Sequence, residues 1–356
     1  MIYKLALKIR HAFYDKGWRK QHTSDVPTVC IGNVTVGGTG KTPHTEMILR
    51  MLLKDEYWGG KNIAVLSRGY KRQSKGFQQV EVSSPAFFSG DEPLQIKKKF
   101  PAVTVAVDND RVEGCGFLCH PETLEKSKKA RRCRNIDIQP ADIIILDDAF
   151  QHRSLKASVN IVLVDFNRPV YEDSLLPYGT LRDLPSRIKA ADIIIVTKCP
   201  EYLTEAEKTA FRENLRLGDS AAKVFFTTME YCKPAGVFPQ MDSRYTYAKR
   251  LILLSGIANA TPLRNYLSDT YQIVKHLSFP DHHTFTQSDM KSLIAATDKW
   301  QTAAVATTEK DSQRILDYPR VPRDLKSKMF HIPIRAVFLS EEEQKEFETT
   351  LFGLIK

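Results

Sequence analysis

The chain has 356 residues, of which 42% are hydrophobic, so it is long enough for two unequal domains and has the composition of a globular protein. Its formal net charge of +10 predicts an anionic partner: nucleic acid, an anionic membrane or a phosphorylated substrate. No apolar run reaches the roughly 18 residues that span a bilayer, no secretory leader is visible, and the six scattered cysteines indicate reduced thiols in a cytosolic protein.

Residues 2–20 have the pattern of an amphipathic helix. Ile2, Leu5, Ile9 and Phe13 recur at helical spacing, with lysine and arginine around them. Aromatic and basic residues in this arrangement suit a helix at a membrane surface, but the same stripe would also suit a helix packed on its own domain. A second basic run, Lys126 to Arg134, is predicted to be a solvated loop.

A glycine-rich segment, residues 37–42 (GGTGKT), follows the predicted strand 28–31 and precedes a predicted helix through residues 46–53. Glycines allow close approach of the backbone to phosphate oxygens, and a helix N-terminus supplies partial positive charge. Lys41 then reaches the β- and γ-phosphates, and the Thr42 hydroxyl is a ligand for Mg²⁺. Thr35 occupies the position of the first glycine in the usual pattern, so the loop is a variant of it.

The chain then alternates buried strands with helices, which predicts an α/β fold: a doubly wound, mostly parallel sheet of the P-loop NTPase type, with a second, smaller α/β domain. The first domain is predicted over residues 1–225 and the second over residues 226–356. Predicted strands are 62–66, 103–107, 143–146, 160–165 and 193–197 in the first domain, and 251–254 and 303–306 in the second.

Polar residues follow several of these strands, where such folds bind ligands. Asp147 and Asp148 end an apolar strand and match the acidic group that phosphate-loop enzymes place near Mg²⁺, with Gln151 close behind. Arg168, Arg182 and Arg187 offer guanidinium groups suited to phosphate. The sequence Thr197-Lys198-Cys199-Pro200 lacks the aspartate that reads guanine, which favours ATP.

Taken in order, seven motifs resemble the tetraacyldisaccharide 4′-kinase family, which phosphorylates the lipid A precursor at the inner membrane of Gram-negative bacteria. They are residues 32–43 (GNVTVGGTGKTP), 67–70 (SRGY), 90–93 (GDEP), 146–152 (LDDAFQH), 175–182 (LLPYGTLR), 281–282 (DH) and 308–311 (TEKD). The chain departs from the family at Ala149, where glycine is usual, and at residues 178–183, where the family has AGPLRE.

The resemblance implies ATP- and Mg²⁺-dependent phosphorylation of the 4′-hydroxyl of a tetraacylated diglucosamine 1-phosphate lipid. It implies that Asp91 acts as the base and is paired with His282, which comes from the second domain. Lys41, the third implied catalytic residue, would hold the ATP phosphates. The resemblance also implies a peripheral enzyme on the cytoplasmic face of the inner membrane, docked through the basic helix at about residues 1–24, with no nucleic acid and no obligate protein partner. The implied nucleotide-binding residues are Thr35, Gly37, Gly38, Thr39, Gly40, Lys41 and Thr42; the metal site is Thr42, Asp147, Asp148 and Gln151, with the choice between the two aspartates open; and the substrate-binding residues are Asn33, Arg68, Arg111, Arg168 and Arg182.

Two other classes of function compete with this reading. A nucleotide-driven switch or metallochaperone also carries a GGTGKT loop, but it leaves the Asp-His pair without a role. A nucleic-acid-binding protein would use the positive charge, but it needs stacking aromatics among the basic residues or a recognised module, and neither is visible.

Overall fold

A computed structural model describes residues 2–125 and 138–355; the basic run 126–134 and Cys133 lie outside the described residues. The chain divides into two compact units. Unit 1 comprises residues 1–82, 96–230 and 335–356, and unit 2 comprises residues 83–95 and 231–334. This division differs from the single boundary predicted near residue 225. Residues 83–95, expected in the first domain, belong to unit 2, and the C-terminal residues 335–356, expected in the second domain, belong to unit 1.

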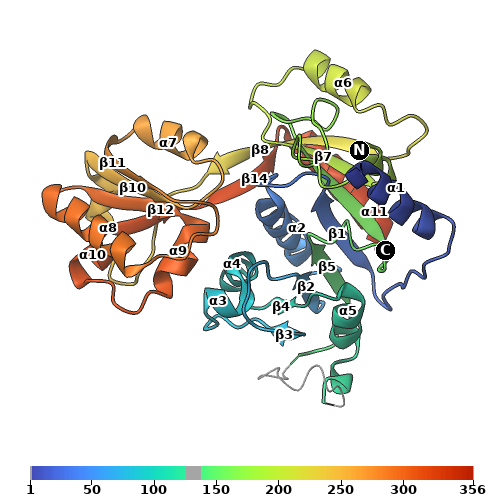
Figure 1. Ribbon diagram of the computed structural model, residues 1–356, viewed down its shortest axis with the longest axis horizontal. Helices are drawn as coiled ribbons and strands as arrows, with labels where there is room; N and C mark the ends of the chain where they lie inside the picture. The colour runs from blue at the N-terminus through green and yellow to red at the C-terminus, as the bar shows by residue number, and fades with distance from the viewer. Residues whose placement is uncertain (1, 126–137, 356) are drawn as a thin grey trace. The chain divides into compact units, whose positions relative to one another are not determined.

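Unit 1 is built on a nine-stranded sheet in the described part of the chain, with the order β14-β8-β7-β6-β1-β5-β2-β4-β3 (Figure 1). The central strand β1 pairs in parallel with β5 and with β6, as expected for a doubly wound sheet. The strands are β1 (Thr28–Asn33), β2 (Ile63–Ser67), β3 (Gln78–Gln79), β4 (Thr104–Val107), β5 (Ile143–Asp147), β6 (Val159–Asp165), β7 (Ile193–Thr197), β8 (Lys223–Tyr231) and β14 (Ile334–Phe338).

Helices cover both faces of this sheet, which explains why its strands read as nearly continuous apolar runs. On one face Cys30, Leu146 and Val162 join the core formed with α5 and α6. On the other, α2 packs on β1 and β5, and Phe225 meets Phe347 of α11 with ring centroids 5.3 Å apart. The helices of unit 1 are α1 (Ile2–Asp15), α2 (Lys41–Lys54), α5 (Arg111–Cys119), η1 (Pro121–Thr123), η2 (Pro185–Ala190), α6 (Glu205–Asn214) and α11 (Glu341–Ile355).

Unit 2 has its own five-stranded sheet in the described residues, β11-β10-β12-β13-β9, which is parallel except at the β9 edge. Helices α8, α9 and α10 share a core on one face, and α7 packs on the other. The elements are β9 (Ala235–Gly236), β10 (Arg250–Ser255), β11 (Gln272–Ser278), β12 (Ala304–Thr308), β13 (Met329–Ile332), α3 (Ala86–Ser89), η3 (Ser243–Tyr247), α7 (Thr261–Ser268), α8 (Gln287–Lys299), α9 (Glu309–Leu316) and α10 (Arg323–Lys328).

Helix α4 (Asp91–Lys99) begins in unit 2, where α3 packs on α9 and the backbone N–H of Ala86 donates to the Asp317 carboxylate at 2.5 Å. Asp91, the first residue of α4, therefore belongs to the same unit as His282. The α/β class and the mostly parallel main sheet predicted from the sequence are confirmed.

Candidate active site

The phosphate loop lies between β1 and α2 in unit 1. Gly37 and Gly40 have φ angles of 93° and 89°, which are readily adopted only without a Cβ. Gly37 and Gly38 are exposed, and Lys41 and Thr42 are half-buried at the start of α2. The loop therefore presents an open backbone and a lysine side chain beside a helix N-terminus, which is the arrangement that binds phosphate.

Buried polar side chains form hydrogen bonds that hold this loop in place. Asn33 is fully buried, and its side-chain amide donates to the hydroxyls of Thr39 at 2.7 Å and Thr35 at 3.3 Å. The backbone N–H of Val36 donates to the Thr180 carbonyl at 2.7 Å, which ties the loop to residues 180–183. Thr35 and Asn33 thus contact the loop's own interior, so their side chains shape the loop from within.

His44 provides a second brace, which the sequence analysis missed. It is fully buried on α2, with Nδ1 2.7 Å from the Gly40 carbonyl oxygen and Nε2 2.9 Å from the Thr227 hydroxyl on β8. A carbonyl only accepts, so Nδ1–H donates to it. Burial lowers the pKa of His44 to about 4, opposed by the bond to Gly40.

This lowered pKa predicts a pH dependence of stability. Unfolded histidine has a pKa of about 6.5, so between about pH 6.5 and pH 4 the unfolded chain binds the extra proton and unfolding becomes easier as the pH falls. We expect this group to remove about 2 kcal/mol of stability between pH 7 and pH 5. Urea unfolding of the wild type and His44→Gln at both pH values measures it; an equal loss in the variant would contradict the assignment.

The two carboxylates after β5 have different surroundings. Asp147 is buried and accepts hydrogen bonds from the hydroxyls of Thr45 at 3.5 Å and Ser67 at 3.2 Å. Asp148 has a φ of 52°, a conformation uncommon outside glycine. It is bonded by Arg182 through both carboxylate oxygens and lies 3.8 Å from the Lys41 ammonium. Burial acts to raise the pKa of Asp148, but Lys41 and Arg182 outweigh it and lower the pKa.

The other predicted arginines are placed differently. Arg111 is buried and donates to the carbonyls of Asp108 and Asn109 at 3.1 Å and of Asp148 at 3.4 Å, which makes it a brace for the strand ends. Arg68 is exposed. The guanidinium of Arg168 would lie 3.6 Å from a Cβ built on Gly37, so this side chain reaches the rim of the phosphate loop.

A second polar cluster lies in unit 2, around Asp91 at the start of α4. His282 Nδ1 is 3.2 Å from Asp91 Oδ2, and both side chains are largely buried. Arg314 Nε lies 3.1 Å from the same oxygen. His282 and Arg314 both contact Oδ2 and so orient the Asp91 carboxylate. The N-terminus of α4 stabilises the negative charge of this carboxylate.

Lys310 fixes the orientation of the histidine. Its ammonium lies 2.9 Å from His282 Nε2 and 3.0 Å from a Glu92 oxygen. An ammonium only donates, so Nε2 accepts and the imidazole proton resides on Nδ1, where it donates to Asp91. Asp91 is therefore the proton acceptor of the pair, and His282 positions it.

Comparison with known proteins identifies the family of the chain. A family model described as tetraacyldisaccharide-1-P 4′-kinase matches residues 1–355. The chain belongs to the tetraacyldisaccharide 4′-kinase family. It is 37% identical to the tetraacyldisaccharide 4′-kinase of Phocaeicola vulgatus over 96% of this chain and 90% of that protein, and 35% identical to that of Porphyromonas gingivalis over 100% and 95%.

A solved structure agrees with the family assignment. The LpxK of Aquifex aeolicus, crystallised in complex with ATP, is 26% identical, covers 100% of this chain and 96% of its own, and superposes with a TM-score of 0.70. The resemblance inferred from the seven motifs is thereby confirmed, and so is the P-loop kinase fold.

Proposed function

We propose that this chain transfers the γ-phosphate of ATP to the 4′-hydroxyl of a tetraacylated diglucosamine 1-phosphate lipid, as its family name describes. Two observations support the proposal, one in each unit: unit 1 has a phosphate loop, and unit 2 has an oriented carboxylate–imidazole pair. A switch protein needs the loop but has no use for the pair. A kinase that acts on an alcohol needs both, because the attacking hydroxyl must lose its proton.

At the nucleotide end, the exposed backbone of Gly37 and Gly38 and the Lys41 ammonium would hold the ATP phosphates. Arg168 at the rim of the loop would supply a further positive charge near the negative charge that develops on the transferred phosphoryl group. In phosphoryl transfer most of the acceleration comes from positioning and electrostatic stabilisation rather than covalent chemistry. At the acceptor end, Asp91 would take the hydroxyl proton, held by His282 and Arg314.

The donor set around Thr42 fits a magnesium ion. Thr42, Asp147 and Gln151 offer hydroxyl, carboxylate and amide oxygens, the ligands that Mg²⁺ prefers. Both oxygens of Asp148 are bonded to Arg182, and both oxygens of Asp147 accept hydrogen bonds from hydroxyls, so either aspartate would exchange a partner on becoming the carboxylate ligand. No cluster of three acidic, histidine or cysteine residues that could hold a metal occurs in the described ranges, which suits an ion that is shared with substrate phosphates. Bound there, the ion would neutralise charge on the phosphates.

Helix α1 supports a peripheral contact with an anionic membrane. Its apolar stripe is exposed: Ile2 by 86%, Leu5 by 58% and Ile9 by 50%. The opposite face is anchored to unit 1, where Leu7 and His11 are buried. Along the part of the chain that the structure describes, no helix is both long and apolar enough to cross a membrane. An anchored helix with an outward apolar stripe and lysines beside it is typical of docking at an interface, here the cytoplasmic face of the inner membrane.

The exposed stripe makes a direct prediction. Replacing Leu5 and Ile9 together by Ser should weaken binding to phosphatidylglycerol vesicles, because about 0.8 kcal/mol is lost for each buried methylene group. Vesicle co-sedimentation measures the effect, and the exposed pair Tyr202→Ser and Tyr247→Ser is a matched control. Equal binding of wild type and the α1 variant would remove the docking role.

The dependence of hydrolysis on the acceptor separates the kinase from the nucleotide switch. We expect ADP to form from ATP only when the lipid acceptor is present, at a rate equal to that of phosphorylated lipid. The measurement is a paired assay of ADP and lipid product, with and without acceptor. Steady ADP release in the absence of lipid would favour the switch.

A further inference from the structure

Arg187 is the one arginine of the predicted phosphate-binding group that the proposed reaction leaves unused. Arg182 bonds to Asp148, whereas Arg187 lies on η2 and stacks on Phe150, with 5.3 Å between the guanidinium carbon and the ring centroid. Among the described residues no hydrogen bond or ion pair reaches its guanidinium, and its Nε is buried without a partner. A half-buried guanidinium with unused donors normally has an ion or ordered water beside it.

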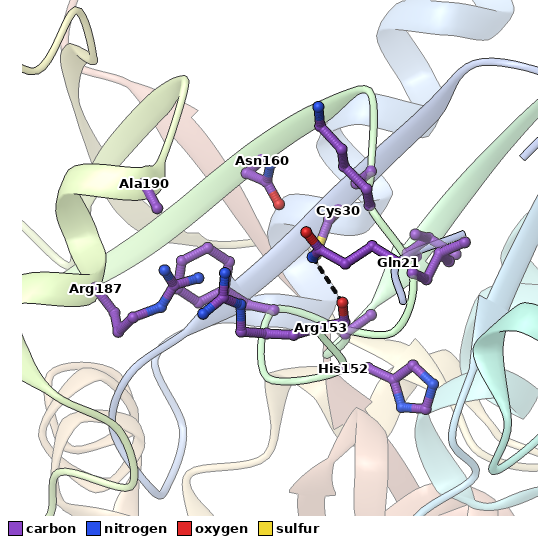
Figure 2. A pocket seen from close by; sticks show the side chains of 13 residues that line it. Gln21, Cys30, His152, Arg153, Asn160, Arg187 and Ala190 are labelled. Atoms are coloured by element: carbon purple, nitrogen blue, oxygen red, sulfur yellow. Dashed lines mark hydrogen bonds between the residues drawn. The ribbon is translucent and has the colours of Figure 1, made fainter. Parts of the chain in front are cut away.

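This guanidinium lines a cavity of about 200 Å³ in unit 1. Figure 2 shows the cavity with Arg187 beside Arg153 on one side and Gln21 and Asn160 on the other. Lys156 also lines it. None of the residues of the phosphate loop belongs to the lining, so the cavity is a site of its own.

The charges around the cavity are unbalanced. Burial lowers the pKa of Arg187, and the neighbouring Arg153 lowers it further, yet a guanidinium remains protonated in proteins. Asp183 and Asp15 oppose these effects, but each has another partner: Asp15 pairs with Arg153 at 2.7 Å, and Asp183 Oδ1 lies 2.6 Å from His11, while Asp183 Oδ2 is buried without a hydrogen-bond partner. Arg153 therefore has a carboxylate partner, whereas the guanidinium of Arg187 forms no ion pair in the part of the chain that the structure describes, so a bound anion would balance its charge.

We propose that this cavity binds a phosphate group through Arg187, with Arg153 and Lys156 as further cationic contacts. A planar guanidinium donates two parallel hydrogen bonds to phosphate oxygens, and the side-chain amides of Gln21 and Asn160 are further donors within the lining. Its volume is below the 300–1,000 Å³ or so of sites for drug-sized ligands, so the occupant is a phosphate group with little attached to it inside the cavity.

Two sources supply such a group: inorganic phosphate in solution, or the headgroup of an anionic phospholipid. The cavity is linked to α1, since Arg153 bonds to Asp15 and Gln21 donates to the Arg153 carbonyl at 2.7 Å. Both sources share the same recognition chemistry, and separate arms of one experiment distinguish them.

The first arm is calorimetric titration of inorganic phosphate into the full chain whose phosphate loop is saturated with a non-hydrolysable ATP analogue. We expect one binding event, weakened at least tenfold in Arg187→Gln, because the neutral amide loses the charge-assisted hydrogen bonds to the phosphate oxygens. The matched control is Arg212→Gln, since Arg212 also stacks on a phenylalanine, at 4.9 Å, but lies outside the cavity. Lys156→Glu, an exposed site that tolerates substitution, should weaken binding without affecting folding.

The second arm is co-sedimentation with phosphatidylcholine vesicles with and without phosphatidylglycerol. If the headgroup is the source, Arg187→Gln loses the preference for phosphatidylglycerol and inorganic phosphate competes with wild-type binding; if free phosphate is the source, vesicle binding is the same in both proteins. Absence of phosphate binding to the wild type in the first arm, or an equal loss in Arg212→Gln, would overturn the proposal, whatever the kinase assay shows.

Discussion

We expect Asp91→Asn to lower the turnover number by about 10²–10⁴-fold, the usual contribution of a general base, and to leave the affinity for ATP unchanged. The amide keeps the shape of the side chain and its place at the start of α4 but cannot accept the hydroxyl proton. The measurement is steady-state phosphorylation of the lipid acceptor, paired with equilibrium binding of ATP. Asp269→Asn, an exposed aspartate of the same unit, is the control.

The partner variant tests whether the two side chains act as a unit. His282→Ala should cause a comparable loss, and the double variant should be little worse than either single one, because residues that act together are not additive. Their contact at 3.2 Å lies within unit 2, so the coupling is a property of that unit. Additive losses, or unchanged turnover in both single variants, would remove the pair from the mechanism.

Lys41→Met is expected to lower turnover by about 10²–10³-fold or more, the range found on removing one stabilising donor from a reacting site, and to weaken ATP binding as well. The Lys41 ammonium lies 3.8 Å from Asp148, and with ATP bound it would reach the β- and γ-phosphates. Turnover and ATP affinity are measured together.

The matched control for this variant is Lys54→Met, which removes an exposed lysine from the last turn of the same helix. Loss in both variants would indicate damage to α2 rather than loss of a phosphate contact. Full activity of Lys41→Met would contradict the role of the loop.

The phosphate loop and the parallel sheet could be predicted because their signals are local. Glycines before a lysine at the start of a helix, and apolar runs such as residues 143–146, carry their structural meaning within a few residues. The predicted strands of the first domain accordingly match β2, β4, β5, β6 and β7 to within one or two residues.

The rest depends on partners far apart in the sequence. Residues 83–95 belong to unit 2 because they contact residues far along the chain: Ala86 bonds to Asp317, which lies more than 200 positions later in the sequence. His44 braces the phosphate loop through its hydrogen bond to Thr227. The two aspartates after β5 differ because Arg182 bonds to Asp148. A lone histidine on a helix or an arginine in a loop gives no local sign of such a contact.

For α1 the sequence left two possibilities open, because periodicity shows that a helix has an apolar stripe but not what the stripe contacts. The structure buries Leu7 and His11 and exposes Ile2, Leu5 and Ile9, so the stripe faces away from the core of unit 1. The helix also ends at Asp15, earlier than the predicted residue 20.

The proposed reaction transfers the terminal phosphate of ATP to one particular hydroxyl of an acylated sugar. Incubation of the chain with ATP labelled at the γ-position and a tetraacylated disaccharide 1-phosphate, followed by mass-spectrometric location of the label, tests it directly. We expect the label at the 4′-oxygen of the distal glucosamine. Label only in free phosphate, or at any other oxygen of the lipid, would contradict it.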